Sequence, residues 1–77
     1  MKKSRLVVRI KLKEILEERG ITQKQLSDLT GITPASVSMV CRNSQTVINL
    51  GYLAKFVETL GIKDIRNLIE LKRVDNG

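Results

Sequence analysis

The sequence predicts an all-α domain, a compact bundle of five helices, and three observations favour it. The dipeptide Gly-Ile begins at residues 20, 31 and 61, each time after a segment whose apolar residues recur at helical spacing. Glycine adopts the left-handed conformation that ends a helix, and an apolar residue after it packs back on the last turn. The 77 residues are 42% hydrophobic but only 3% aromatic, so we expect one domain with an aliphatic core.

Capping residues mark where these helices begin. Thr22 and Thr33 each follow a Gly-Ile pair, and a threonine hydroxyl accepts a hydrogen bond from an amide of the first helical turn. Thr22 and Gln25 have the spacing of a capping box, and Pro34 stands at a first helical position, where its missing N–H is not needed. The five predicted helices span residues 8–19, 23–30 and 34–42, a segment capped by Asn49 that ends near Leu60, and a segment that begins near Asp64.

The beginning of the first helix is ambiguous. The letters "VRIKLK" alternate apolar and basic residues with period two, which also suits a strand or an extended arm. We divide the chain into a basic N-terminal arm at residues 1–7, a folded domain at residues 8–71 and a frayed tail at residues 72–77.

The same periodicity predicts which side chains form the core. They are Val8, Leu12, Ile15, Leu16, Leu26, Leu29, Val37, Val40, Cys41, Leu50, Leu53, Ala54, Val57, Leu60, Ile65, Leu68 and Ile69. Tyr52 and Phe56 lie beside the main apolar face of the fourth helix, where they either pack in the core or form a dimer surface with the fifth helix. Cys41 is interpreted as a small core residue, with a redox-sensing thiol as the alternative.

Composition excludes several classes of function. The chain has no histidine and one cysteine, and its eight acidic residues are scattered, so we expect no catalytic residues, no metal, no cofactor and no enzyme activity. No apolar run is long enough for a transmembrane helix or a secretory signal, so we expect no membrane partner. The lone cysteine suits the reducing cytoplasm, which is the predicted location.

The positive charge is concentrated at one end of the chain. The net charge is +6, and residues 1–13 carry six basic residues and no acidic one. The remaining eight basic residues are matched by all eight acidic residues. A basic arm of this kind favours a polyanionic partner such as DNA, RNA or an anionic membrane, although it also suits a solubilising tail.

The spacing around residue 31 indicates how two of the helices are joined. Only Gly31 and Ile32 separate Thr30, at the end of the second predicted helix, from the cap at Thr33. Such a short turn forces two helices to cross at a steep angle. This arrangement is the helix-turn-helix, whose second helix can enter the major groove of DNA.

The run "TQKQLSDLTGITPASVSMV" resembles the Cro/CI (XRE, lambda-repressor-like) helix-turn-helix family. The residues in register with that family are Thr22, Gln23, Leu26, Ser27, Gly31, Ile32, Thr33, Val37 and Ser38. The downstream run "NLGYLAKFVETLGIKDIRNLIEL" is similar to the fourth and fifth helices of the family, so the resemblance covers about residues 8–71. It implies a five-helix domain that binds operator DNA and regulates transcription, often as a dimer.

The resemblance also implies which residues contact double-stranded DNA. Gln23 would bond a backbone phosphate, and the residues that would face the groove are Thr33, Pro34, Ala35, Ser36, Ser38 and Met39. Arg42, Asn43 and the loop to Thr46 would lie along the backbone. Some of these residues have an alternative role: Gln23 can simply begin a helix, Ser36 and Ser38 can be ordinary exposed residues, and Met39 can belong to a protein interface.

The sequence departs from the family at three positions of the third helix and its end. Met39, Cys41 and Asn43 stand where the family often has a basic residue, Glu and Gly. The groove-facing set holds no Arg, Lys, Gln or Asn before Arg42, and those side chains make the contacts that best discriminate between bases. We therefore expect weak readout that favours A·T-rich half-sites, with Gln23 or Gln25 as the one bidentate reader.

These observations predict a sequence-specific DNA-binding transcriptional regulator, a repressor of the Cro/CI type that binds as a homodimer. The alternative is a helix-turn-helix module that binds another protein, or an antitoxin-type autoregulator that acts with a partner protein. Whether the basic arm contacts DNA or only covers the front of the first helix stays open. RNA or membrane association through the arm is less favoured, because the chain has two aromatic residues and a broken apolar stripe.

Overall fold

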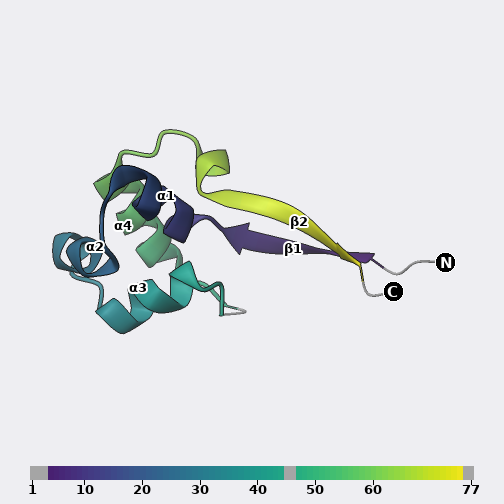
Figure 1. Cartoon of the computed structure of the whole chain (residues 1–77), viewed down its shortest axis with the longest axis horizontal. Coiled ribbons are helices and arrows are strands. Elements are labelled where there is room, and N and C mark those ends of the chain that lie inside the picture. The colour runs from purple at the N-terminus through teal and green to yellow at the C-terminus, as the bar shows by residue number, and fades with distance from the viewer. Residues whose placement is uncertain (1–3, 45–46, 76–77) are drawn as a thin grey trace.

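Four α-helices form a body from which a two-stranded ribbon projects (Figure 1) in the computed structural model, which describes residues 4–44 and 47–75. The helices are α1 Leu12–Arg19, α2 Gln23–Thr30, α3 Pro34–Cys41 and α4 Leu50–Leu60, and a single 3-10 turn follows at Ile65–Asn67. The strands are β1 Ser4–Ile10 and β2 Ile69–Asp75. The ribbon makes the molecule elongated, with extents of 48 × 24 × 22 Å.

The predicted all-α, five-helix fold is wrong at both ends of the chain. β1 and β2 pair antiparallel, from Ser4 opposite Asp75 to Ile10 opposite Ile69. The first helix therefore begins at Leu12 rather than Val8, and the predicted fifth helix is only the 3-10 turn. The period-two pattern of "VRIKLK" did signal a strand, and its β-branched residues fit a pleated surface. The partner strand lies at the other end of the chain, which local spacing does not reveal.

The predicted helix ends and caps are confirmed. Gly20, Gly31 and Gly61 all adopt the left-handed conformation, with φ of 66°, 76° and 63°. Thr22 and Gln25 form the capping box, in which the Gln25 amide donates to the Thr22 hydroxyl at 3.0 Å and the Thr22 amide donates to Gln25 Oε1 at 2.8 Å. Thr33, Asn49 and Asp64 also accept hydrogen bonds from backbone amides, as N-caps of α3, α4 and the 3-10 turn.

The core lies between the four helices and the base of the ribbon. Its buried apolar side chains are Leu12, Ile15, Leu16, Leu26, Ile32, Val37, Val40, Cys41, Leu53, Phe56, Leu60, Ile62 and Leu68. Phe56 is fully buried, which supports its interpretation as a core residue rather than a dimer surface, and Tyr52 packs against this core. The prediction was wrong for side chains that are more than half exposed, namely Val8, Leu29, Leu50 and Ile65, and for the exposed Ala54.

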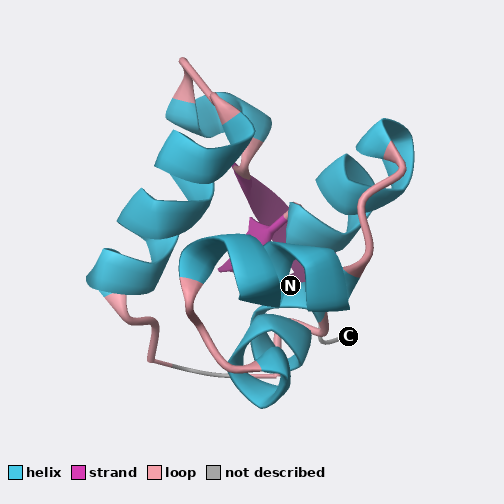
Figure 2. Ribbon diagram, turned by 90° about the vertical axis from the view of Figure 1, so that its left-hand side faces the viewer, coloured by secondary structure: helices cyan, strands magenta, loops and turns pink. Residues whose placement is uncertain are grey.

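The beginning of β1 and the end of β2 lie at the far end of the ribbon, away from the helices (Figure 1). When the molecule is turned by 90°, so that the left-hand side of Figure 1 faces the viewer, the helices are nearest and the strands lie behind them (Figure 2). The division at residues 7/8 and 71/72 stays a prediction, but β1 runs across the first boundary and β2 across the second. Lys2, Lys3, Thr46 and residues 76–77, which also figured in the predictions, lie outside the described residues.

Candidate nucleic-acid interface

The turn between α2 and α3 is held by side-chain hydrogen bonds from within α2. The buried Ser27 hydroxyl donates to the carbonyl of Ile32, so the small polar residue at this position ties the two helices together. The Thr30 hydroxyl donates to the Leu26 carbonyl at 2.8 Å and accepts from the Ile32 amide at 3.2 Å. Because Ile32 itself is buried, the start of α3 is fixed relative to α2.

Thr33 and Pro34 define the first turn of α3. The Thr33 hydroxyl accepts from the Ser36 amide at 3.3 Å and donates to the Ser36 hydroxyl at 2.9 Å. Pro34 occupies the first helical position, and Val37 and Val40 face the core on the inner side. The two hydroxyls predicted to face a DNA groove are thus already bonded to each other, although both retain accepting capacity.

The outer side of α3 carries most of the predicted contact residues. Thr33, Pro34, Ala35 and Arg42 are exposed, and Ser36, Ser38 and Met39 are half-buried. Helical spacing places residues 35, 38, 39 and 42 on one stripe, opposite the buried Val37 and Val40. These positions are uncharged up to the guanidinium of Arg42, which caps the C-terminal end of the helix. Gln23 is the first residue of α2 and half-buried, so its phosphate contact stays a prediction.

Asn43 has a structural task that sequence reasoning missed. Its side-chain amide forms two hydrogen bonds with Ile10 at the end of β1: Oδ1 accepts from the Ile10 amide at 2.7 Å, and Nδ2 donates to the Ile10 carbonyl at 2.9 Å. Its backbone has a φ of 53°, and asparagine tolerates this left-handed region better than most residues. This explains why asparagine suits a position where the family often has glycine. The amide group predicted to lie along DNA is therefore already engaged within the protein.

The basic N-terminal segment is less available for DNA than its composition suggests. Arg9 pairs with Glu14 of α1 and, at 3.1 Å, with Glu70 of β2. The hydrogen bond to Arg9 holds the pKa of the Glu14 carboxyl below its usual range, and Glu14 in turn raises the pKa of the Arg9 guanidinium. Arg9 therefore fastens the ribbon to α1, whereas Arg5 is exposed on the ribbon. Of the alternatives left open for this segment, the structure shows the strand rather than an extended arm or the front of the first helix, and contact of the segment with DNA stays a prediction.

The described part of the chain gives little support for a redox-sensing thiol, a metal site or a membrane-spanning helix. Cys41 is buried, and desolvation raises the pKa of its thiol, followed by the effect of the negative charge of Glu14, which favours the core interpretation. No group of three or more potential metal-ligating residues occurs within 4–44 and 47–75. Among these same residues, no helix has the length and apolar character needed to cross a membrane.

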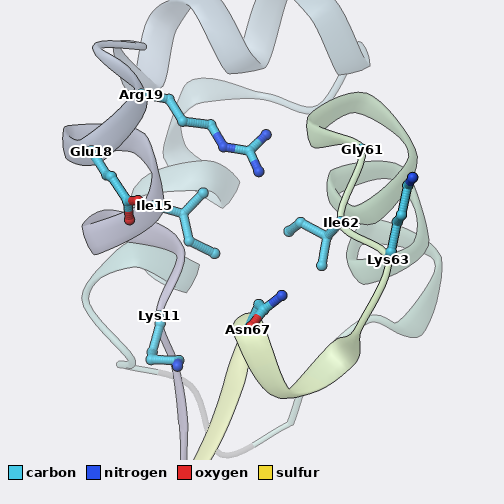
Figure 3. Close-up of a pocket in the computed structure, with 8 residues that line it drawn as sticks. All are labelled: Lys11, Ile15, Glu18, Arg19, Gly61, Ile62, Lys63 and Asn67. Atoms are coloured by element: carbon cyan, nitrogen blue, oxygen red, sulfur yellow. The ribbon is translucent and has the colours of Figure 1, made fainter.

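A cavity of about 550 Å³ lies between α1 and the segment that follows α4 (Figure 3). Ile15 and Ile62 point toward each other across it, and the Arg19 guanidinium extends into it from α1. That guanidinium donates to the Leu60 carbonyl at the end of α4, so it joins the two helices. None of the lining residues belongs to α2 or α3, and the cavity is therefore separate from the outer side of α3.

The chain matches a helix-turn-helix family model (HTH_3) over residues 12–67, which is most of its length. It therefore belongs to this helix-turn-helix family, the XRE family of DNA-binding transcription regulators, and the predicted resemblance to Cro/CI proteins is confirmed. Members of this family are not typically enzymes. Neither the curated proteins nor the solved structures contain a match to the chain. The matched region holds all four helices and leaves out both strands, β1 and β2.

Proposed function

We propose that this protein is a sequence-specific repressor of transcription that inserts α3 into the major groove of operator DNA as one of a pair of subunits. The observation that carries the proposal is the outer side of α3, whose residues are exposed or half-buried and uncharged, on a helix-turn-helix that the family match covers in full. Intramolecular hydrogen bonds of Ser27 and Thr33 at its beginning and of Asn43 after its end fix the position of that helix. A reading helix held this firmly loses little conformational freedom on binding. Because DNA is the proposed partner, the proposal also includes the predicted cytoplasmic location.

Readout through this helix is proposed to be weak and to favour A·T-rich half-sites. Ala35, Pro34 and Met39 offer apolar contact to a thymine methyl group, and Ser38 can donate or accept. Thr33 and Ser36 are partly occupied by their mutual hydrogen bond. Affinity then depends mainly on phosphate contacts, for which Arg42 at the C-cap of α3 is well placed, and on the use of two subunits.

Two exposed alanines provide a matched test. Ala35 lies on the outer side of α3 and Ala54 lies on α4, so Ala35→Glu and Ala54→Glu make the same change of charge at two exposed helical sites. A glutamate in the first turn of a helix is also compatible with the helix dipole. We expect Ala35→Glu to weaken DNA binding about tenfold or more through repulsion from the phosphates, and Ala54→Glu to bind nearly as the wild type.

The operator is first obtained by selection from a random-sequence DNA library, and binding is then measured by fluorescence anisotropy at two salt concentrations. A palindromic A·T-rich consensus with steep salt dependence supports the proposal. Equal loss in both glutamate variants would mean that α3 is not the contact surface. Absence of binding by the wild type at low salt would sink the proposal and favour the alternative, in which Met39 and the uncharged side of α3 bind another protein.

A further inference from the structure

The two faces of the ribbon differ in chemistry. In an antiparallel pair, residues opposite each other point to the same side, and successive residues alternate between sides. The register therefore collects Leu6, Val8 and Leu71 on one side, which we call the apolar face, together with Ile10 and Ile69 near the body. The other side carries Arg5, Val7, Arg9, Glu70, Lys72 and Val74, and we call it the basic face.

The apolar face is uncovered over most of its length. Leu6, Val8 and Leu71 are 56%, 64% and 67% exposed, whereas Ile10 and Ile69 pack against the core. The ribbon projects away from the helices, and no other described segment lies over it (Figure 1). Sheets are stable when an apolar face packs on another layer, and a two-stranded ribbon alone is marginally stable in water. The exposed side chains thus mark a face built for contact.

We propose that this face packs against the same face of a second copy of the chain, so that two ribbons form a two-layer contact around a two-fold axis. The distribution of charge between the two faces of the ribbon favours a second copy of the chain as the occupant of the apolar face. The apolar face carries one cation, Arg73 opposite Leu6, and one anion, Asp75 at its outer end, whereas Arg5 and Lys72 point to the basic face. Two chains of net charge +6 can therefore meet here without bringing their excess positive charge into the contact.

A polyanion would choose the opposite side of the ribbon. DNA or RNA would gain little from Leu6, Val8 and Leu71, since most of its contacts to proteins go to phosphate and sugar. The contact between two ribbons is small: strands of seven residues are about 23 Å long, and two strands are about 10 Å wide, which is less than the area of a standard protein interface. We therefore expect association that depends on concentration, rather than a permanent dimer.

The base of the ribbon connects this contact to α3. Asn43 follows α3 and binds both backbone groups of Ile10, and the Lys11 amide donates to the Leu68 carbonyl at 2.6 Å beside it. Packing two ribbons together would thus fix the separation of the two α3 helices. This last consequence rests on the proposed function, because it has meaning only if α3 binds DNA, whereas the association itself does not.

A pair of double variants tests the surface in the absence of DNA. Val8→Thr with Leu71→Thr makes the apolar face polar while keeping residues that favour strands. Val7→Thr with Val74→Thr makes a matched change on the half-buried valines of the basic face. Sedimentation equilibrium from micromolar to millimolar protein should show association of the wild type and the control variant. The dissociation constant of the apolar-face variant should rise about tenfold or more.

Disulfide cross-linking of single-cysteine variants gives a second measurement, which reports on contact between two copies rather than on the stability of the fold. Val8→Cys places a thiol on the apolar face and Val7→Cys places one on the basic face, while the native Cys41 is buried and does not compete. Under diamide oxidation, Val8→Cys should form a disulfide-linked dimer and Val7→Cys should not. Both variants are compared with the wild type by circular dichroism to establish that the fold is kept.

Each outcome is decisive for the ribbon. A wild type that stays monomeric at millimolar concentration, equal weakening by both double variants, or faster cross-linking at residue 7 than at residue 8 would overturn the proposal. The DNA experiment fails separately: a protein that dimerises through the apolar face but binds no DNA would disprove the proposed function and leave this inference standing.

Discussion

The helical body and the ribbon are held together by different means. In the body, thirteen apolar side chains are buried, and caps at Thr22, Thr33 and Asn49 begin three of the helices. In the ribbon, three large apolar side chains are mostly exposed, and attachment to the body depends on the packing of Ile10 and Ile69 at its base together with polar contacts of Asn43 and Arg9 and a backbone bond to Leu68. The comparison indicates that the helices of the body are specified by residues close together in the sequence. The ribbon, in contrast, forms only when segments from both ends of the chain meet each other and the residue that follows α3.

The largest effect is expected in the body, at the fully buried Phe56. Phe56→Ala removes a large aromatic side chain from an otherwise aliphatic core and should lower the free energy of unfolding by about 3–5 kcal/mol. Urea unfolding followed by circular dichroism measures the change. Leu29→Ala is the control, because Leu29 is 66% exposed on α2 and its truncation should cost less than about 1 kcal/mol. Similar small effects for both would mean that Phe56 lies on a surface.

A smaller effect is expected at the joint between the two regions. Asn43→Gly keeps a residue that accepts the left-handed backbone, but it removes both hydrogen bonds to Ile10. Because Ile10 is half-buried, we expect a loss of about 1–3 kcal/mol in the free energy of unfolding. Amide hydrogen exchange should accelerate in β1 and β2 more than in α1–α4. Uniform acceleration across the chain would show that Asn43 supports the whole fold rather than the ribbon.

The same contrast decides what could be predicted from the sequence. Gly20, Gly31, Gly61 and the capping box are encoded within four or five residues, so their spacing was enough to place the helices and the helix-turn-helix. The strands were missed because β1 pairs with a segment at the opposite end of the chain, and "VRIKLK" alone fits several structures. The exposed Leu50 was misassigned because periodicity shows which side of a helix is apolar, but not how far the core extends.

The candidate interface divides in the same way. The outer stripe of α3 followed from the spacing of Val37 and Val40, and the structure places Ala35, Ser38 and Met39 opposite them. The engagement of Asn43 by Ile10 could not be inferred, because it joins residues from two distant segments. One signal was present: asparagine just after a helix is typical of the left-handed conformation, which removes such a residue from the helical surface.

The smallest effect is expected from the ion pairs that fasten the ribbon to α1, and it depends on pH. The Arg9 guanidinium holds the pKa of Glu14 below its ordinary value of 4.5, so Glu14 binds protons more weakly in the folded state than in the unfolded state. Its stabilising contribution is therefore present above the unfolded pKa and is lost as the pH falls through the lower folded pKa. Both side chains are partly exposed, so solvent and salt weaken the pair.

Arg9→Gln isolates this contribution. The wild type should lose more stability than the variant when urea unfolding is compared at neutral and strongly acidic pH, and the difference should shrink at high salt. Arg66→Gln is the control, since Arg66 lowers the pKa of Asp64, but Asp64 is the N-cap of the 3-10 turn and this pair does not join the ribbon to a helix. Only the Arg9 variant should also accelerate hydrogen exchange in β1. If both variants left exchange in β1 unchanged, Arg9 would contribute charge to the ribbon without fastening it.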